Sequence, residues 1–316
     1  MKSVFGTNII YTIFGESHSE YMGITITGLK SGIKIDHDLI KSLIERRKPS
    51  KSFNTLRKEK DEYKIISGEF NGFTTGSPLT VLVKNEEMDS SKYQEGICRP
   101  GQSDYASFMK YDGFNDYRGG GHLSGRLTLL IVIAYGIIKP ILDDLNIEIS
   151  SKSYYEEVDN DTTGGKIEVF AEGVKAGLGE PFFYSTEGIL SNLFFSIPSV
   201  KAVEFGLGTK FTEKKGRDVI EEVQYKDGKV LFNTNFNGGI NGGITNGAEI
   251  KATLTFKPIA SVPYEVNAIN VKTKENIIYQ NKSNHDLSII NRCGVIAEAM
   301  MGIGLLELIT LDKAVK

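Results

Sequence analysis

Three consecutive polar residues in the stretch FGESHSEYMG have side chains suited to acid–base chemistry: Glu16, Ser17 and His18. They supply a carboxylate, a hydroxyl and an imidazole within one short segment that follows a glycine. The chain has only four histidines, so a group that exchanges protons near neutral pH has few other sources. The segment is either a catalytic cluster or a polar turn, and the residues alone leave both interpretations open.

A second group of residues suited to chemistry lies in the basic stretch ERRKPSKSFNTLRKEKD at residues 45–61. Its guanidinium groups, on Arg46, Arg47 and Arg57, can hold phosphate or carboxylate oxygens through paired hydrogen bonds. The formal net charge of the chain is −3, so any anion must be held by such a local concentration of positive charge. The alternative is a solvated helix end, where cationic side chains are also favourable.

Two glycine-rich stretches are candidates for ligand binding, YRGGGHLSGR at residues 117–126 and NFNGGINGGITNG at residues 235–247. Glycines let backbone N–H groups approach a ligand closely, and the first stretch precedes an apolar helix whose N-terminus favours anions. The first lacks the ending of a phosphate-binding P-loop and the spacing of a dinucleotide fingerprint. A tight turn remains the alternative for the first stretch, and a long turn for the second.

A further polar cluster, NHDLS at residues 284–288, places His285 beside Asp286 directly before the last predicted helix. Asp286 has a simple structural alternative, because an acidic residue at this point can cap the helix. The residues alone do not decide between the two.

The elements that must position these residues follow from the spacing of apolar side chains. NIIYTIF and GITITGL flank the Glu-Ser-His segment and predict a hairpin-like pair of strands, which puts the cluster on a loop. Helical spacing after Asp36, an expected N-cap, predicts a short amphipathic helix that ends by Pro49. Residues 63–85 predict two strands joined by a turn segment.

The second half of the chain alternates predicted helices and strands. The run after RGGGH is apolar on all sides, which predicts a buried helix, and it falls short of the roughly 20 residues that span a bilayer. Residues 182–197 predict a helix, 226–234 and 248–257 predict strands, and the last apolar stretch predicts a long closing helix. The polar, turn-rich stretch 150–170 is the best candidate for a domain boundary by composition.

The composition is that of an ordinary soluble globular protein and excludes several functional classes. With 316 residues, 40% of them hydrophobic, the chain can bury a large core. Its near-neutral charge gives no general attraction to nucleic acid or to a membrane surface. Two cysteines are too few for a disulfide framework, and the N-terminus lacks a secretory signal, so we expect a cytoplasmic protein.

Taken together and in this order, the polar and glycine-rich blocks resemble the chorismate synthase family. The matching blocks run from about residue 6 to the closing helix, and several are long and specific. They read GESH, RRKPSKSFNTLRKEKD, SGEFNGFTTGSPL, RPGQSDY, KYDGFNDYRGGG, GLGEPFF, SIPSVKAVEFG, NGGINGGITNG and HD.

The resemblance implies a fold and an assembly. We expect an α/β fold, with residues 1–316 forming a single domain in which long helices are sandwiched between antiparallel β-sheets. The stretch 150–170 is then a shortened insertion within that domain and not a boundary. The family assembles as a homotetramer.

The resemblance also implies an activity, that of a carbon–oxygen lyase acting on a phosphate. The family catalyses trans-1,4-elimination of phosphate from 5-enolpyruvylshikimate 3-phosphate, which gives chorismate for aromatic amino acid biosynthesis. Reduced FMN is required as cofactor. No dinucleotide fold is evident, so we expect NADPH only as an indirect reductant, with an external flavin reductase as a possible partner.

Site residues are carried over from the family position by position. The matched catalytic positions are His18, as the acid on the phosphate, Asp286, near flavin N5, and Gln102. The matched substrate-binding residues are Ser17, Arg46, Arg47, Arg57, Arg99 and Arg126. The matched cofactor-binding residues are His122, Leu123, Ser124, Gly242, Lys257, Pro258, Ile259, Ala260, Ser261 and Asn284. No metal ligands are expected.

Gln102 is the main departure from the family pattern, because a second active-site histidine usually stands in its place. A glutamine amide can donate a hydrogen bond to an anionic flavin, but it cannot give up a proton at neutral pH. Four other positions also differ: His122 and Asn284 stand where arginine is usual, Leu127 where glutamate is usual, and Ser19 where glycine is usual. The stretch KKGRDVIEE does not match the corresponding family block.

Three interpretations follow from the match and its departures. The chain is a divergent working chorismate synthase, a related flavin-dependent lyase that eliminates phosphate from another cyclic substrate, or a catalytically silent relative that binds flavin or similar anions. Retention of His18, Asp286 and most of the arginines favours an enzyme, and the first interpretation is preferred.

Overall fold

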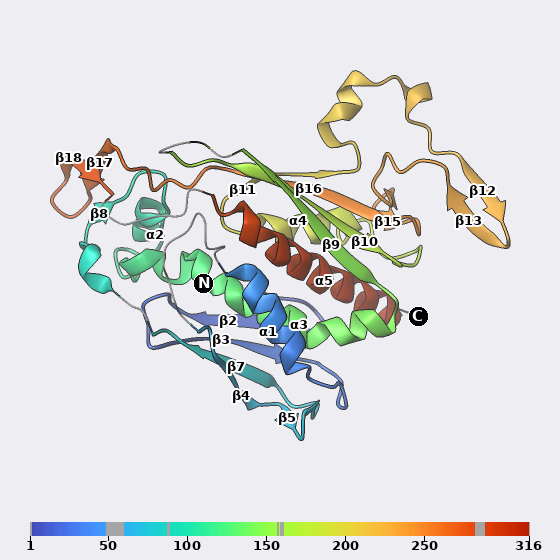
Figure 1. Ribbon diagram of the computed structural model, residues 1–316, viewed down its shortest axis with the longest axis horizontal. Coiled ribbons are helices and arrows are strands. Elements are labelled where there is room, and N and C mark those ends of the chain that lie inside the picture. Colours follow the sequence, from blue (N-terminus) through green and yellow to red (C-terminus); the bar gives the residue numbers. More distant parts are fainter. Residues whose placement is uncertain are drawn as a thin grey trace.

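The computed structural model describes residues 2–48, 60–86, 89–156, 158, 161–281 and 288–315. Two antiparallel sheets enclose a layer of helices (Figure 1). This is the predicted α/β arrangement, with long helices between antiparallel sheets.

The N-terminal sheet has the spatial order β1-β2-β3-β7-β4. Its strands are β1 (Val4–Phe5), β2 (Ile10–Gly15), β3 (Tyr21–Thr27), β7 (Leu79–Lys84) and β4 (Tyr63–Ser67). β2 pairs with β3 in antiparallel register, which confirms the predicted pair of strands around the Glu-Ser-His segment. Along β7, Leu79, Val81 and Val83 are buried and alternate with more exposed residues, because only one face of the strand is covered.

The second sheet has the order β11-β16-β10-β9. Its strands are β11 (Val200–Phe205), β16 (Ile250–Phe256), β10 (Gly165–Glu172) and β9 (Glu148–Tyr155). The strand expected at 248–257 is confirmed as β16. The stretch 150–170 was expected to be turn-rich, and this was wrong for most of it, because β9 and β10 pair along eight residues each. Many of its polar side chains lie on the less buried face of these strands.

The helical layer contains α1 (His37–Arg47), α3 (Thr128–Asp144), α4 (Thr186–Phe195) and α5 (Ile290–Val315). α3 packs against β3, α1 and α5, and α5 packs against β9, β10 and α4. The helices approach closely where one has no side chain: a Cβ at Gly136 of α3 would lie 2.7 Å from Cγ1 of Ile40 in α1. All three predicted helices after residue 120 are present, although α4 begins at Thr186 and not at residue 182.

α1 begins as the sequence predicts. The Asp36 side chain accepts hydrogen bonds from the backbone N–H groups of Asp38 and Leu39, which have no partner within the first helical turn. Ile40, Leu43 and Ile44 form the buried stripe of the helix. The helix brings Arg47, its last residue, to the start of α3, where its side chain donates to Thr128.

Two helical segments, Arg118–Asp144 and Ile290–Lys313, are long and apolar enough to cross a membrane by length and composition. Their most apolar windows are 78% and 89% buried within the fold. They are central helices of the hydrophobic core, which confirms the predicted burial of the run after RGGGH, whereas the expectation that this run is too short to span a bilayer was wrong.

The two ends of the chain are joined by hydrogen bonds. The backbone N–H of Thr7 donates to Oε1 of Glu307 at 2.8 Å, and Nδ2 of Asn8 donates to the carbonyl of Thr310 at 3.0 Å. Glu307 lies on α5 and is buried. The loop before β2 is thus fixed to the last helix.

A smaller unit lies at one end of the sandwich, at the left of Figure 1. It contains β8 (Ile97–Cys98), β17 (Glu265–Asn270) and β18 (Glu275–Gln280), in the order β18-β17-β8, together with α2 (Asp104–Lys110). Three short 3-10 helices lie near it, η1 (Ser90–Lys92), η2 (Arg118–Leu123) and η3 (Gly125–Leu127).

Short hairpins complete the fold. They are β5 (Glu69–Phe70) with β6 (Phe73–Thr74), β12 (Val223–Lys226) with β13 (Lys229–Phe232), and β14 (Ile240–Asn241) with β15 (Ile244–Thr245). The single strand expected at 226–234 was wrong, because Asp227 and Gly228 turn the chain there with φ of +52° and +75°. The 3-10 helices η4 (Gly208–Glu213) and η5 (Gly216–Asp218) precede this hairpin, which projects from the body (Figure 1).

Candidate active site

The Glu-Ser-His segment forms the tight connection between β2 and β3. Nδ2 of Asn85 donates to the carbonyls of Glu16 and Ser19, at 3.1 and 2.7 Å, and the Ser17 N–H donates to the carbonyl of Gly121 at 3.2 Å. The connection is thereby held between the end of β7 and the glycine-rich segment. The sequence prediction that the cluster lies on a loop is confirmed.

His18 is buried within this connection, with 6% of its surface exposed. Its Nδ1 lies 3.0 Å from Oγ of Ser90, and the edge of its ring meets the ring of Tyr93 at a centroid distance of 5.2 Å. The other side of the imidazole lies over Gly119. A Cβ at Gly119 would be 2.5 Å from both Cδ2 and Nε2, and the residue has a φ of +59°. A glycine at position 119 is therefore required for the close approach of the backbone to this histidine.

Ser17 lies beside His18 and is also buried. Its hydroxyl is within hydrogen-bond distance of the carbonyls of Gly119, at 3.2 Å, and Arg118, at 3.4 Å. The GESH and RGGG blocks, about 100 residues apart in the sequence, thus form one structural unit.

The predicted arginines are held in different ways. Arg47 donates through Nε to Thr128 at 3.1 Å and through Nη2 to the carbonyls of Gly125 at 3.0 Å and Arg126 at 3.3 Å. Burial, together with the nearby positive charges of Arg126 and Arg292, lowers the pKa of Arg47 to about 10, against the opposing effect of Asp61. Positive charge is therefore concentrated at the start of α3.

Arg126 and Arg46 each have a carboxylate partner. Arg126 forms a buried ion pair with Asp61, and its Nε lies 3.5 Å from Oδ1 of Asn85. Arg46 forms a two-pronged ion pair with Glu298 of α5, at 2.7 and 2.8 Å, and Ser151 of β9 donates to the same carboxylate. Arg126 thus lies with Arg47, whereas Arg46 is directed toward the second sheet.

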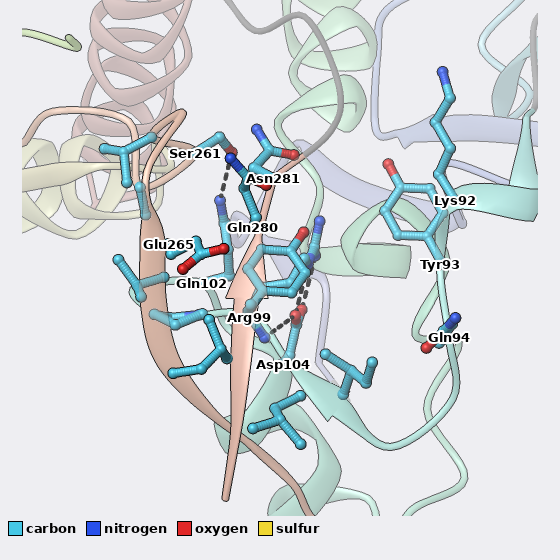
Figure 2. Close-up of a pocket in the computed structure, with 18 of the residues that line it drawn as sticks. Lys92, Tyr93, Gln94, Arg99, Gln102, Asp104, Ser261, Glu265, Gln280 and Asn281 are labelled. Atoms are coloured by element: carbon cyan, nitrogen blue, oxygen red, sulfur yellow. Dashed lines mark hydrogen bonds and ion pairs between the residues drawn. The ribbon is translucent and has the colours of Figure 1, made fainter.

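A cavity of about 530 Å³ lies between the loop before α2 and the β17–β18 hairpin. Gln102 reaches across it and donates through Nε2 to Oγ of Ser261 at 3.3 Å (Figure 2). Lys257 donates to the carbonyl of Gly101 at 2.7 Å, so the RPGQSDY block and residues 257–261 are joined at two points. Ile97, Val262, Val266, Ile277 and Tyr279 supply apolar wall.

Arg99 is positioned at this cavity by Asp104. Two hydrogen bonds, of 2.6 and 2.8 Å, join the guanidinium to the carboxylate (Figure 2), and the same guanidinium lies 5.2 Å from the ring centroid of Tyr93. Tyr93 also contacts His18, so it lies between the buried imidazole and the cavity. The histidine and the cavity are neighbouring parts of one site.

The sequence that forms this site also matches a known protein family. The family model described as chorismate synthase matches residues 9–158 and 152–310. The chain belongs to the chorismate synthase family.

Relatives extend the match over almost the whole chain. The chorismate synthase of Pyrococcus abyssi is 38% identical over 96% of this chain and 96% of its own. That of Chitinophaga pinensis is 38% identical over 98% and 97%. A crystal structure of a chorismate synthase has the same fold, with a TM-score of 0.75, 22% identity, and coverage of 98% and 93%.

The structure brings the residues carried over from chorismate synthases together in two groups. Around the glycine-rich segment lie His18, Ser17, Arg47 and Arg126. Around the cavity lie Gln102, Arg99, Ala260 and Ser261. Lys257, Pro258 and Ile259 lie in the same segment as Ser261, with the Ile259 carbonyl accepting from Thr162. Ser124 begins η3 and accepts from the N–H of Arg126, and Leu123 is exposed beside it. Arg57, Asn284 and Asp286 lie outside the described residues.

Two predicted cofactor positions are placed differently from the rest. His122 has both ring nitrogens engaged within the fold: Nδ1 donates to the Gly15 carbonyl at 2.7 Å, and Nε2 accepts from Ser3 at 2.6 Å. The structure thus gives His122 a role in holding the strand before Glu16. Gly242 lies in the β14–β15 turn, and in Figure 1 the label of β15 is far from those of β8 and β17, elements that supply residues of the cavity wall.

Sequence reasoning missed three residues that the site geometry brings out. Ser90 and Tyr93 contact His18, and Asp61 is the counter-ion of Arg126. Ser90 and Tyr93 lie in DSSKY, a stretch with no distinctive spacing, so no sequence signal identified them. Asp61 ends the basic stretch and is one of three acidic residues in it, so the sequence offered it only as one of several possible counter-ions.

Proposed function

We propose that the protein catalyses the chorismate synthase reaction, the elimination of phosphate from 5-enolpyruvylshikimate 3-phosphate to give chorismate. The observation that carries the proposal is the buried His18, whose ring contacts Tyr93 of the cavity wall, in a chain that matches curated chorismate synthases over nearly its full length. The reaction is a carbon–oxygen bond cleavage, so the protein is a lyase of aromatic amino acid biosynthesis.

The cavity has the size and chemistry to hold a flavin. Its volume falls within the range of about 300–1,000 Å³ that is usual for cofactor pockets, and its walls combine apolar side chains with a similar share of polar and charged ones. The Gln102 amide and the Ser261 hydroxyl supply hydrogen-bonding groups at one side. We infer that Gln102, Ala260 and Ser261 hold reduced FMN there, together with Lys257, Pro258 and Ile259 of the same segment.

Reduced FMN, when bound, supplies electron density to the substrate as phosphate leaves and recovers it when the ring loses a proton. The residues of the chain bind and orient the substrate and handle protons. Arg47 and Arg126 attract the substrate anions to the start of α3, where burial strengthens charge interactions. Ser17 and Arg99 are proposed as further contacts.

His18 is proposed as the acid on the departing phosphate. The imidazole is buried, and its Cδ2 and Nε2 atoms lie close to the backbone of Gly119. Transfer of a proton to the phosphate oxygen makes it a better leaving group as the carbon–oxygen bond breaks. Asp286 remains the proposed acceptor of the ring proton.

The remaining proposals rest on the family resemblance. Arg46 and Arg57 would contribute to substrate binding, and Leu123, Ser124, His122, Gly242 and Asn284 to flavin binding. The protein would act in the cytoplasm as a homotetramer and take reduced flavin from an external reductase, with NADPH only as an indirect reductant.

The direct test is an anaerobic assay with chemically reduced FMN and 5-enolpyruvylshikimate 3-phosphate. Phosphate release and chorismate absorbance should rise together, with flavin needed only in catalytic amount. Reactions without flavin serve as the control. Phosphate release without chorismate would indicate a different product, and no turnover by folded, flavin-binding protein would contradict the proposal.

A further inference from the structure

The hydroxyl of Ser90 is the polar group that contacts Nδ1 of His18, at 3.0 Å. It lies in η1, a short helical turn more than 70 residues from the histidine along the chain. The following inference rests on the proposed function, since it concerns how His18 delivers a proton.

The turn that carries Ser90 is held without help from His18. Asp89 caps it by accepting from the N–H of Ser91 at 3.2 Å, and Lys92 pairs with Asp89 at 3.3 Å. The Ser90 carbonyl accepts from the N–H of Tyr93. The Ser90 hydroxyl is therefore presented to the ring by a turn with its own stabilising contacts.

The acid role restricts which ring nitrogen can act. A neutral imidazole that gave up its only N–H proton would become an anion, so the acid must be the imidazolium, with hydrogen on both nitrogens. Its Nδ1–H then points at Oγ of Ser90, which can only accept. Because Nδ1 is engaged with Ser90, Nε2 is the nitrogen assigned to lose the proton.

We propose that Ser90 is a positioning residue: its hydroxyl accepts a hydrogen bond from Nδ1–H of His18 and thereby directs Nε2 toward the departing phosphate. When Nε2 gives its proton to a phosphate oxygen, the N–H bond breaks, an O–H bond forms, and the ring remains as the neutral Nδ1–H tautomer. The hydrogen bond to Ser90 is present before and after the transfer, so the ring need not rotate.

Other groups around His18 are consistent with this arrangement. Tyr93 fixes the plane of the ring through an edge contact, and the Asp116–Arg118 ion pair lies nearby. Burial alone would raise the pKa of Asp116, but hydrogen bonds from Arg118, with the charge of His18, hold it below its usual range. Asp116 is thus a carboxylate near His18 that is paired with Arg118.

The test compares ring tautomers and rates in Ser90→Ala, Ser90→Thr and the matched control Ser91→Ala. Ser91 is the adjacent serine of the same turn, and its hydroxyl bonds to Asp89. Protein labelled with ¹⁵N-histidine has four imidazoles, and His18→Gln identifies the signals of His18 in magic-angle-spinning spectra. These spectra report which nitrogen carries the proton and do not require turnover.

In the unaltered protein, the neutral ring of His18 should show a protonated Nδ1 and an unprotonated Nε2. Ser90→Ala should shift the neutral ring toward the Nε2–H tautomer. It should also lower kcat by about 10- to 100-fold, the factor that corresponds to loss of a hydrogen bond to a charged group, and leave KM little changed. Ser90→Thr should restore both the spectrum and most of the rate, and Ser91→Ala should leave the His18 signals unchanged.

An unprotonated Nδ1 in the unaltered protein, or His18 signals and kcat that are the same in Ser90→Ala, would overturn the inference. A protein that shows the expected tautomers but does not turn over 5-enolpyruvylshikimate 3-phosphate would instead count against the proposed function. The spectra and the assay therefore separate the two failures.

Discussion

Replacing Gly119 with alanine should disable the proposed acid without unfolding the protein. The added Cβ would lie 2.5 Å from Cδ2 and Nε2 of His18, whereas ordinary contacts begin at 3.4 Å. The ring or the backbone must therefore move by the difference, 0.9 Å. A misplacement of about 1 Å in a catalytic group lowers the rate by about 100-fold, so we expect a fall in kcat of that order.

Alanine at this position also carries a conformational penalty, because the φ of Gly119 is +59°. A left-handed backbone costs an L-residue about 1–2 kcal/mol, which corresponds to a loss of a few degrees in Tm. Gly72→Ala is the matched control. Gly72 has a φ of +78°, and no other atom lies within 4 Å of a Cβ built there.

The two variants separate strain from displacement of the histidine. Both should lose similar stability in thermal or urea unfolding, but only Gly119→Ala should lose activity in the anaerobic assay for chorismate formation. If Gly119→Ala kept its kcat within about twofold, or if Gly72→Ala lost as much activity, the argument from the contact with His18 would be refuted.

Three further results are expected. His18→Ala should lower the elimination rate by about 100-fold or more, the usual weight of a positioned proton donor, with flavin affinity retained in a binding titration; an unchanged rate would mean that the segment is structural. Gln102→His should change the rate of single-turnover elimination at saturating reduced FMN by less than about tenfold, because we expect position 102 to serve only as a hydrogen-bond donor. A large gain in this rate would show that a proton must be transferred from position 102. The KM for 5-enolpyruvylshikimate 3-phosphate should rise as the pH passes through about 10, since Arg47 loses its positive charge there; the rise should be absent in Arg47→Ala, and its persistence would point to another group.

Much of the fold could be predicted because local signals agree with the packing. Asp36 caps α1 as its residue type suggests, and the alternation in β16 leaves Ile250, Ala252, Leu254 and Phe256 on the buried face. Polar strands were harder to predict. β9 has few apolar residues because most of it is exposed or half-exposed. Its sequence therefore lacks the alternation of apolar residues that would have predicted a strand paired with β10.

The hairpin β12–β13 was missed although the sequence contains its signal. Asp-Gly is a preferred pair for a two-residue turn in which both residues have positive φ, and Asp227-Gly228 adopts that conformation. Giving weight to that pair would have divided the single predicted strand into two.

At the site, the sequence predicted which blocks matter better than it predicted what each side chain contacts. The GESH and RGGG blocks do meet, but His122 in the second block is turned to Ser3 and Gly15. Arg46 is one residue from Arg47, yet it pairs with Glu298 of α5. Neighbouring residues on a helix point about 100° apart, so such partners depend on tertiary packing that the order of residues does not specify.

The central place of α5 has a consequence for how the chain is made. This helix follows every strand of both sheets in the sequence, yet it lies against β9 and β10 and carries the glutamate that fixes the loop before β2. During translation, the face of the second sheet that packs on α5 therefore lacks this partner until the 26 residues of the helix emerge. A nascent chain arrested before α5 should expose that apolar face, and it should bind chaperones more strongly than a chain that includes the helix.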